Sequence, residues 1–274
     1  MTRSQQPALA FFAIGMIGLG VLALIYGDFA MVWQAVAEWV PGRTALAYVS
    51  GVIMLLGGIG LLFARTAGWS AAILFPYLAV WVLLKVPAVL TSPQVEVVWL
   101  GFGEIAVLFM GGWVLFAKLA EPRDGSWLKF ASSQQTIRAL QLFFGLCLIP
   151  IGLSHLVYVK ATTDFVPPWL PFRVGWVYLS GVGQIACGLG LLLSILPRFA
   201  AFTEAAMIGS FTVLVWIPRI LAGPKERLPW TAFFISWAIG SGAWVVAQSF
   251  RPSKTNLKAQ SPQREAAEFA EAKS

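Results

Sequence analysis

Two glutamates, Glu104 and Glu204, stand inside long apolar stretches of the chain. A carboxyl group in the middle of a membrane-spanning helix costs about 3 kcal/mol, so such residues generally face the interior of a helix bundle or a cavity. Proton transfer is one chemistry that carboxyl groups perform in this setting. The alternative is that each side chain snorkels to a nearby membrane surface. The two positions are therefore candidate intramembrane site residues without an assigned catalytic role.

A second set of candidates consists of polar and aromatic residues near the ends of apolar stretches. A quinone or a similar amphiphile needs donors for its carbonyl oxygens, which His and Arg supply, and flat aromatic surface, which Trp and Tyr supply. For the aromatic residues the alternative is the bilayer interface, where Trp and Tyr gather in any case, and for the single histidine it is a structural hydrogen bond. The candidate ligand-binding residues are His155, Tyr158, Asp164, Trp169, Arg173, Tyr178 and Gln184 in the second half of the chain, and Asp28, Trp33, Trp39, Arg43 and Tyr48 in the first.

Other kinds of site are not expected. With two cysteines and one histidine, a Cys/His zinc site is not expected, and no metal ligands are predicted. Cys147 and Cys187 form no Cys-x-x-Cys motif, and thiols in apolar surroundings are inert, so a redox pair is not expected. Gly-x-Gly pairs at 58–60 and 101–103 lie in apolar stretches without a strand-to-helix turn, which excludes a nucleotide site.

The elements that must position these residues are membrane-spanning helices. Of 274 residues, 58% are hydrophobic and only 11% are charged, which excludes a cytosolic enzyme, a nucleic-acid reader and a small disulfide-rich secreted domain. Apolar stretches long enough to cross about 30 Å of hydrocarbon as helices occur eight times, at 8–26, 45–64, 67–90, 97–118, 137–158, 174–194, 199–221 and 231–250. The composition therefore predicts an all-α, polytopic membrane helical bundle that contacts the lipid bilayer.

The chain also repeats itself at a distance of 130 residues. This shift places Trp39, Pro41, Arg43, Tyr48, Ser50 and Gly51 on Trp169, Pro171, Arg173, Tyr178, Ser180 and Gly181. One inserted residue, placed beside Pro197, moves the shift to 131 and then superimposes Pro87, Trp99 and Trp113 on Pro218, Trp230 and Trp244. The pattern indicates a tandem duplication of a four-helix unit. Because four is even, the two repeats are expected to be parallel.

The repeat predicts the domain organisation. The first unit comprises residues 1–120, a cytoplasmic linker residues 121–136, the second unit residues 137–250, and a polar cytoplasmic tail residues 251–274. Lys and Arg number 12 on the side of the N terminus and 7 on the opposite side, so both termini are predicted to be cytoplasmic. Glycines seven residues apart, at 51 and 58 and again at 181 and 188, favour close helix packing, the alternative being clearance for a ligand.

Three segments of the second half carry a resemblance to a known family. They are Gly-Leu-Ser-His at 152–155, Phe-Val-Pro-Pro-Trp-Leu-Pro at 165–171 and the helix that opens Tyr-Leu-Ser-Gly at 178–181. Together they resemble the DoxX-like family of small bacterial membrane proteins. The first half keeps Trp-Val-Pro-Gly-Arg at 39–43 and Tyr-Val-Ser-Gly at 48–51, but Ile25 stands in the place of His155.

The resemblance implies a multi-pass protein of the bacterial inner membrane. It implies an accessory or quinone-associated component of a membrane redox system, with a quinone as the possible cofactor and another membrane or redox subunit as a possible partner. The alternative is a non-catalytic binder, carrier or chaperone-like protein for a small lipophilic molecule. Whether the protein is an enzyme stays open, and nucleic acid is not expected as a partner.

Overall fold

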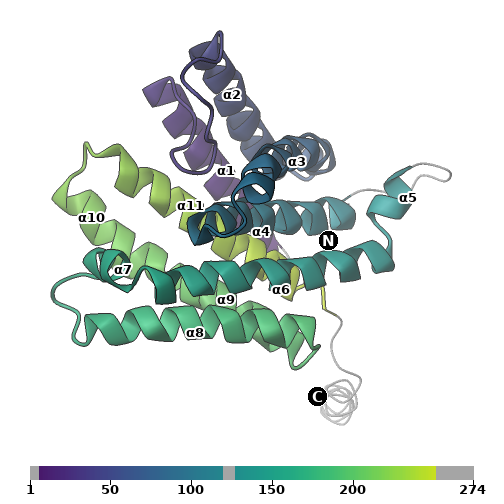
Figure 1. Ribbon diagram of the computed structural model, residues 1–274. Helices are drawn as coiled ribbons and strands as arrows, with labels where there is room; N and C mark the ends of the chain where they lie inside the picture. The colour runs from purple at the N-terminus through teal and green to yellow at the C-terminus, as the bar shows by residue number, and fades with distance from the viewer. Residues whose placement is uncertain (1–5, 120–126, 251–274) are drawn as a thin grey trace, which may run out of the picture.

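A computed structural model of the chain describes residues 6–119 and 127–250. Within these ranges the protein is all-α, with no β-strand (Figure 1). Eight helical segments are long and apolar enough to cross a membrane, which confirms the predicted polytopic bundle. They are α1 (Gln6–Tyr26), α2 (Arg43–Leu61), α3 (Ala67–Thr91), α4 (Glu96–Leu119), α6 (Gln134–Val157), α8 (Arg173–Leu192), the composite segment Pro197–Ala222 and α11 (Arg227–Ala247).

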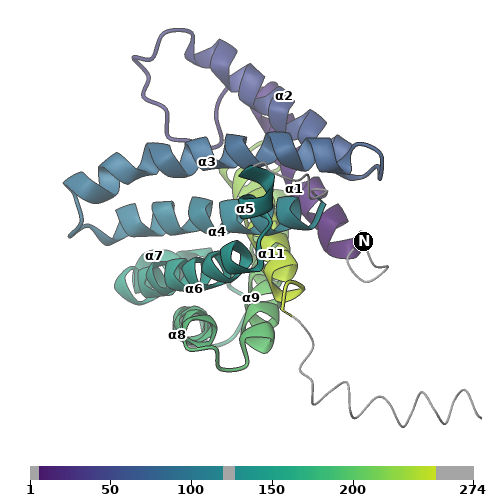
Figure 2. The ribbon, with the colours of Figure 1, turned by 90° about the vertical axis from the view of Figure 1, so that its right-hand side faces the viewer.

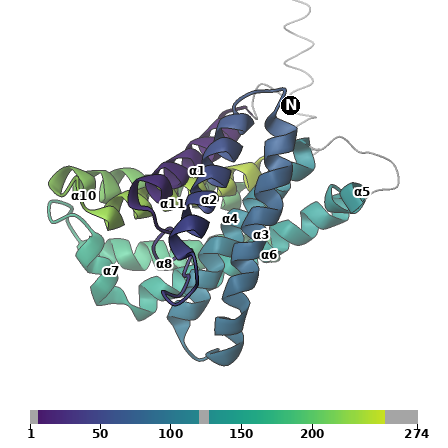
Figure 3. The ribbon, with the colours of Figure 1, turned by 90° about the horizontal axis from the view of Figure 1, so that it is seen from above.

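The long helices pack in a pattern that is the same in both halves. In the first half α1 packs on α2, α2 on α3 and α3 on α4; in the second half α6 packs on α8, α8 on α9 and α9 on α11. Figure 2 shows α2, α3, α4, α6 and α8 as successive neighbours across the molecule. Between the halves, α1 packs against α11, α6 against α4, and α4 against α11 (Figure 3). Each half therefore uses the last long helix of the other half to cover its first.

This packing crosses the boundary expected between the two units. The division at residues 120 and 137 stays a prediction. Residues 121–126 of the linker and the whole tail at 251–274 lie outside the described residues. The short helix α5 (Trp127–Ala131) precedes α6 within the linker. Another short helix, α7 (Val159–Phe165), lies between α6 and α8, where the first half has an irregular loop between α1 and α2.

The paired glycines bring the first two long helices of each half into close contact. A Cβ atom on Gly188 would lie 2.6 Å from the carbonyl oxygen of Gly145, and one on Gly58 would lie 2.8 Å from that of Ala13. A Cβ on Gly181 would meet the carbonyl oxygen of Gly152 at 2.8 Å. The packing role predicted for these glycines is confirmed, because backbone atoms of the neighbouring helix occupy the space that a ligand would need.

The third long helix differs between the halves by a π-helical turn. In the second half it consists of α9 (Pro197–Phe211), the π-helix η1 (Thr212–Trp216) and α10 (Ile217–Ala222). In the first half α3 continues as an α-helix over the whole corresponding length. A single inserted residue widens one α-helical turn into a π turn. Such turns are rare in proteins, but those that occur are often found at functional sites.

The π turn corrects the predicted position of the insertion. The starts of α3 and α9, at Ala67 and Pro197, are 130 residues apart, whereas the starts of α4 and α11, at Glu96 and Arg227, are 131 apart. The loop before Pro197 is thus no longer than its counterpart, and the extra residue lies further along, at the π turn. With the shift still 130 at this point, Glu204 matches Leu74, whereas a shift of 131 would place it on Ile73. In the same way Met207 matches Tyr77.

Candidate functional site

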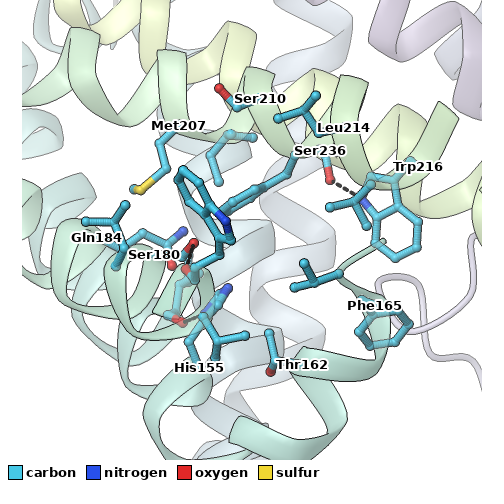
Figure 4. A pocket seen from close by; sticks show the side chains of 18 of the residues that line it. His155, Thr162, Phe165, Ser180, Gln184, Met207, Ser210, Leu214, Trp216 and Ser236 are labelled. Atoms are coloured by element: carbon cyan, nitrogen blue, oxygen red, sulfur yellow. Dashed lines mark hydrogen bonds between the residues drawn. The ribbon is translucent and has the colours of Figure 1, made fainter. Parts of the chain in front are cut away.

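A cavity of about 530 Å³ lies in the second half, among α6, α7, α8, α9, η1 and α11 (Figure 4). Most of its wall is apolar, with aromatic rings from Phe165, Trp176, Phe211 and Trp216. The polar groups on the wall include Glu104, His155, Ser180 and Gln184. A mostly apolar cavity with a few polar groups is the general form of a site for a small molecule.

His155 lies near the end of α6, on the cavity wall. Its Nδ1 atom is 3.1 Å from the carbonyl oxygen of Ile151, and its ring stacks on Phe211 with 6.1 Å between centroids. A carbonyl oxygen only accepts hydrogen bonds, so this contact assigns the hydrogen of the neutral ring to Nδ1. The Nε2 atom is then left as an acceptor.

Gln184 on α8 and Glu204 on α9 form a buried pair, of which Gln184 lines the cavity. Their side chains are 1% and 0% exposed, and Gln184 Nε2 donates to Glu204 Oε1 at 3.4 Å. The other oxygens, Gln184 Oε1 and Glu204 Oε2, have no partner in the part of the chain that the structure describes. Both atoms are acceptors, and a proton on Glu204 would give this buried pair the donor that it lacks.

Glu104 belongs to α4 in the first half but lines the cavity of the second. The indole nitrogen of the buried Trp33 donates to Glu104 Oε2 at 3.0 Å. Lys85 exerts an electrostatic influence on this carboxylate, but its own ammonium donates to the carbonyl oxygen of Val32 at 2.8 Å. Because α4 packs against both α6 and α11, the site is completed by residues from both halves of the chain.

The corresponding region of the first half is filled. Only about 10 Å³ remains among Trp33, Gln34, Tyr77 and their neighbours, which is about the space of one water molecule. Gln34 Nε2 donates to Ser50 Oγ at 3.1 Å and to the Tyr77 hydroxyl at 2.6 Å, and the Ser50 and Tyr77 hydroxyls are 2.7 Å apart. In the second half Ser180 stands at the position equivalent to Ser50, but Met207 stands at the position equivalent to Tyr77. The cavity of the second half therefore stays open.

Of the residues predicted for ligand binding, the structure brings His155 and Gln184 to the cavity. Arg43 and Arg173 instead donate through Nε to the carbonyl oxygens of Val36 and Val166, at 3.1 and 2.9 Å. These matching contacts hold the loop that precedes α2 or α8 in each half. The remaining predicted residues other than Asp28 and Trp33 lie away from the cavity with exposed side chains: Trp39, Tyr48, Tyr158, Asp164, Trp169 and Tyr178.

Asp28 joins the two halves at the end of the molecule where α1 ends. Its carboxylate contacts Arg43 Nη1 at 2.5 Å and Arg227 Nη1 at 2.9 Å, and accepts from the backbone N–H of Phe29 at 2.8 Å. Burial alone would raise the pKa of Asp28, but the hydrogen bonds from Arg227, Phe29 and Arg43 outweigh it and hold the pKa below its ordinary value. This arrangement is a structural ion-pair cluster, since Arg227 begins α11 of the second half.

Sequence reasoning missed several residues of the cavity, among them Ser180, Met207, Phe211 and Trp216. These are ordinary side chains for a membrane helix and carry no motif. The sequence did contain one signal for these residues, the change in the spacing of the internal repeat from 130 to 131 residues. That change marks the π turn, which begins directly after Phe211. Cys147 and Cys187 are buried free thiols and do not line this cavity.

The comparisons with known proteins concern the part of the chain that holds the cavity. A family model described as a domain of unknown function, DUF8561, matches residues 144–241. This stretch includes His155, Ser180, Gln184, Met207 and Phe211. No curated protein and no solved structure matches the chain.

Proposed function

We propose that the protein binds a small lipophilic molecule in the cavity of its second half, as a binder or carrier without catalysis of its own. The observation that supports this most directly is the contrast between equivalent regions of the two halves. They share the same helix packing, but the cavity measures about 530 Å³ in the second half and about 10 Å³ in the first. A mostly apolar cavity of this volume lies in the size range of sites that bind small molecules. A bound molecule would fill it.

The test transfers the filling residue of the first half to the second. Met207→Tyr places a phenol at the position equivalent to Tyr77, within reach of Ser180 as Tyr77 is of Ser50. The ring would obstruct the part of the cavity beside Ser180. The matched control is Met31→Tyr, because Met31 is 38% exposed and does not line the cavity. Binding is measured with the neutral fluorescent probe N-phenyl-1-naphthylamine on the full chain in dodecyl maltoside.

We expect saturable probe binding to the wild type and to Met31→Tyr. In Met207→Tyr the affinity for the probe should fall at least about tenfold, because the probe can bury less of its apolar surface in the obstructed cavity. Mass spectrometry of solvent extracts then identifies what copurifies with the wild type and is absent from Met207→Tyr. Equal probe binding by all three proteins would refute the proposal, because it would place the probe outside the cavity.

A quinone-associated role in a membrane redox system, with another membrane or redox subunit, stays a prediction. Its support is the family resemblance, together with His155 and the aromatic rings on the cavity wall. The cavity lacks the arginine donors expected for quinone carbonyls, since Arg43 and Arg173 donate to backbone carbonyls. The lipophilic binder is therefore the function that the site supports best.

The proposal includes a location in the bacterial inner membrane with both termini in the cytoplasm. The excess of Lys and Arg on the side of the N terminus supports this orientation. A reporter enzyme fused after Ser274 checks it, and a reporter active only outside the cytoplasm would overturn it.

A further inference from the structure

We infer that the molecule bound in the second-half cavity is a lipophilic amine in its ammonium form, held by the carboxylate of Glu104. This inference rests on the proposed function, because it names the class of ligand for the same cavity. Three features of the wall carry it: the direction of its hydrogen bonds, its charge and its aromatic surface.

The hydroxyl groups of the wall present acceptors. Ser180, Ser210 and Thr162 each donate their hydrogen to the carbonyl oxygen four residues back in the chain, at 2.7 to 3.0 Å. Only their oxygen lone pairs remain for a ligand.

The other polar groups of the wall add to this bias. His155 presents Nε2 as an acceptor, because its Nδ1 faces the carbonyl oxygen of Ile151. Ser236 is an exception, because its hydroxyl accepts a hydrogen bond from Trp216 Nε1 at 3.0 Å and keeps its own hydrogen for another acceptor. A ligand with hydrogen-bond donors complements such a wall, whereas a carbonyl compound meets mostly other acceptors.

The charge of the wall selects among donors. Among the described residues that line the cavity, there is no Lys or Arg. Glu104 accepts from Trp33 but stands in no ion pair within the described ranges, where the ion pairs involve Asp28 and Asp164. A carboxylate in an apolar cavity without a cation at contact distance favours a ligand that brings the positive charge with it.

The aromatic rings suit the same ligand. Trp176 and Trp216 donate their N–H groups to Pro171 and Ser236, so the ring faces are what they offer to the cavity. Phe165 and Phe211 also line the cavity, although the Arg219 guanidinium already lies over the Phe165 ring at 4.8 Å and Phe211 stacks on His155. Aromatic faces attract an ammonium group through the ring quadrupole, more strongly where water is excluded.

The experiment measures displacement of N-phenyl-1-naphthylamine by two competitors of the same chain length. N,N-dimethyldodecylamine is protonated at neutral pH, and dodecanol is its neutral counterpart. The test variant is Glu104→Gln, whose amide oxygen can still accept from Trp33. The matched control is Glu96→Gln, on the same helix but outside this cavity. All proteins are full chains in dodecyl maltoside.

We expect the amine to displace the probe from the wild type and from Glu96→Gln, with affinity about tenfold to hundredfold lower in Glu104→Gln, as for the loss of one charge-assisted hydrogen bond. Dodecanol should have the same affinity for all three proteins. Amine affinity that is unchanged in Glu104→Gln, or no higher than that of dodecanol, would overturn this inference while probe binding upheld the proposed function. Failure of the probe itself to bind would overturn both.

Discussion

Asp28→Asn tests the ion-pair cluster that joins the two halves of the chain. The carboxylate of Asp28 takes two arginine contacts and one backbone N–H, and its side chain is 26% exposed. Asparagine keeps one oxygen for Phe29 or one arginine, but its amide N–H groups face the other guanidinium. The variant therefore loses the negative charge and sets donor against donor.

The expected magnitude follows from the charge-assisted hydrogen bonds that the substitution removes. One such bond contributes about 1.5–3 kcal/mol when protected from water, and solvent at a quarter-exposed site reduces this to about 1–2 kcal/mol. For a chain of this size, each kcal/mol shifts the melting temperature by about 2–4 °C. We expect the apparent melting temperature of Asp28→Asn in dodecyl maltoside to fall by roughly 2–8 °C.

The matched control is Asp164→Asn. Asp164 pairs with Lys160 at 3.7 Å, but the two side chains are 66% and 95% exposed, and ion pairs of this kind contribute almost nothing to stability. Its melting temperature should equal that of the wild type. Equal melting of all three proteins would refute the argument that the Asp28 cluster holds the halves together.

The dependence on pH gives a second check with a definite sign. Because the pKa of Asp28 in the folded protein lies below the ordinary value of 3.8, its contribution is fully present above that value and is lost as the pH falls through the folded pKa. The difference in melting temperature between wild type and Asp28→Asn should be constant from pH 7 to about 5 and should shrink below about pH 4. A difference that grows on acidification would contradict the sign.

Two further predictions concern the interior of the bundle. Gly188→Ala should lower stability by about 1–3 kcal/mol, because its Cβ would lie 2.6 Å from the backbone oxygen of Gly145. The control Gly209→Ala, whose Cβ would have nothing within 4 Å, should leave the melting temperature unchanged or raise it. Equal losses of stability in the two variants would show that close packing is not the cause. If a proton on Glu204 joins its Oε2 to Gln184 Oε1, infrared spectra of the wild type should contain the carbonyl band of a protonated carboxylic acid that Glu204→Gln removes. A spectrum unchanged by Glu204→Gln would exclude that hydrogen bond.

The apolar stretches of the chain were enough to predict where the long helices lie. Predicted spans such as 67–90 and 97–118 agree within a residue or two with α3 (Ala67–Thr91) and α4 (Glu96–Leu119), because helix length is dictated by bilayer thickness and hydrophobicity, which are local properties. The internal repeat likewise predicted that Gly58 and Gly188 have equivalent packing roles, since a missing side chain acts on its nearest helix.

The cavity depends on tertiary structure, because its residues come from elements that are distant in the sequence. Glu104 reaches it from the first half only because α4 packs against both α6 and α11. Met207 leaves the cavity open at the position where Tyr77 fills the equivalent space of the first half. The two residues can be matched only when the inserted residue is known to lie at the π turn.

The sequence by itself thus determined the helical class, the spans and the duplication, all of which follow from composition and spacing along one helix at a time. Only the tertiary structure decided which half holds a cavity, which polar groups line it and that Arg43 and Arg173 do not. Those outcomes depend on which atoms of different helices meet, and neither hydrophobic periodicity nor a repeat encodes that.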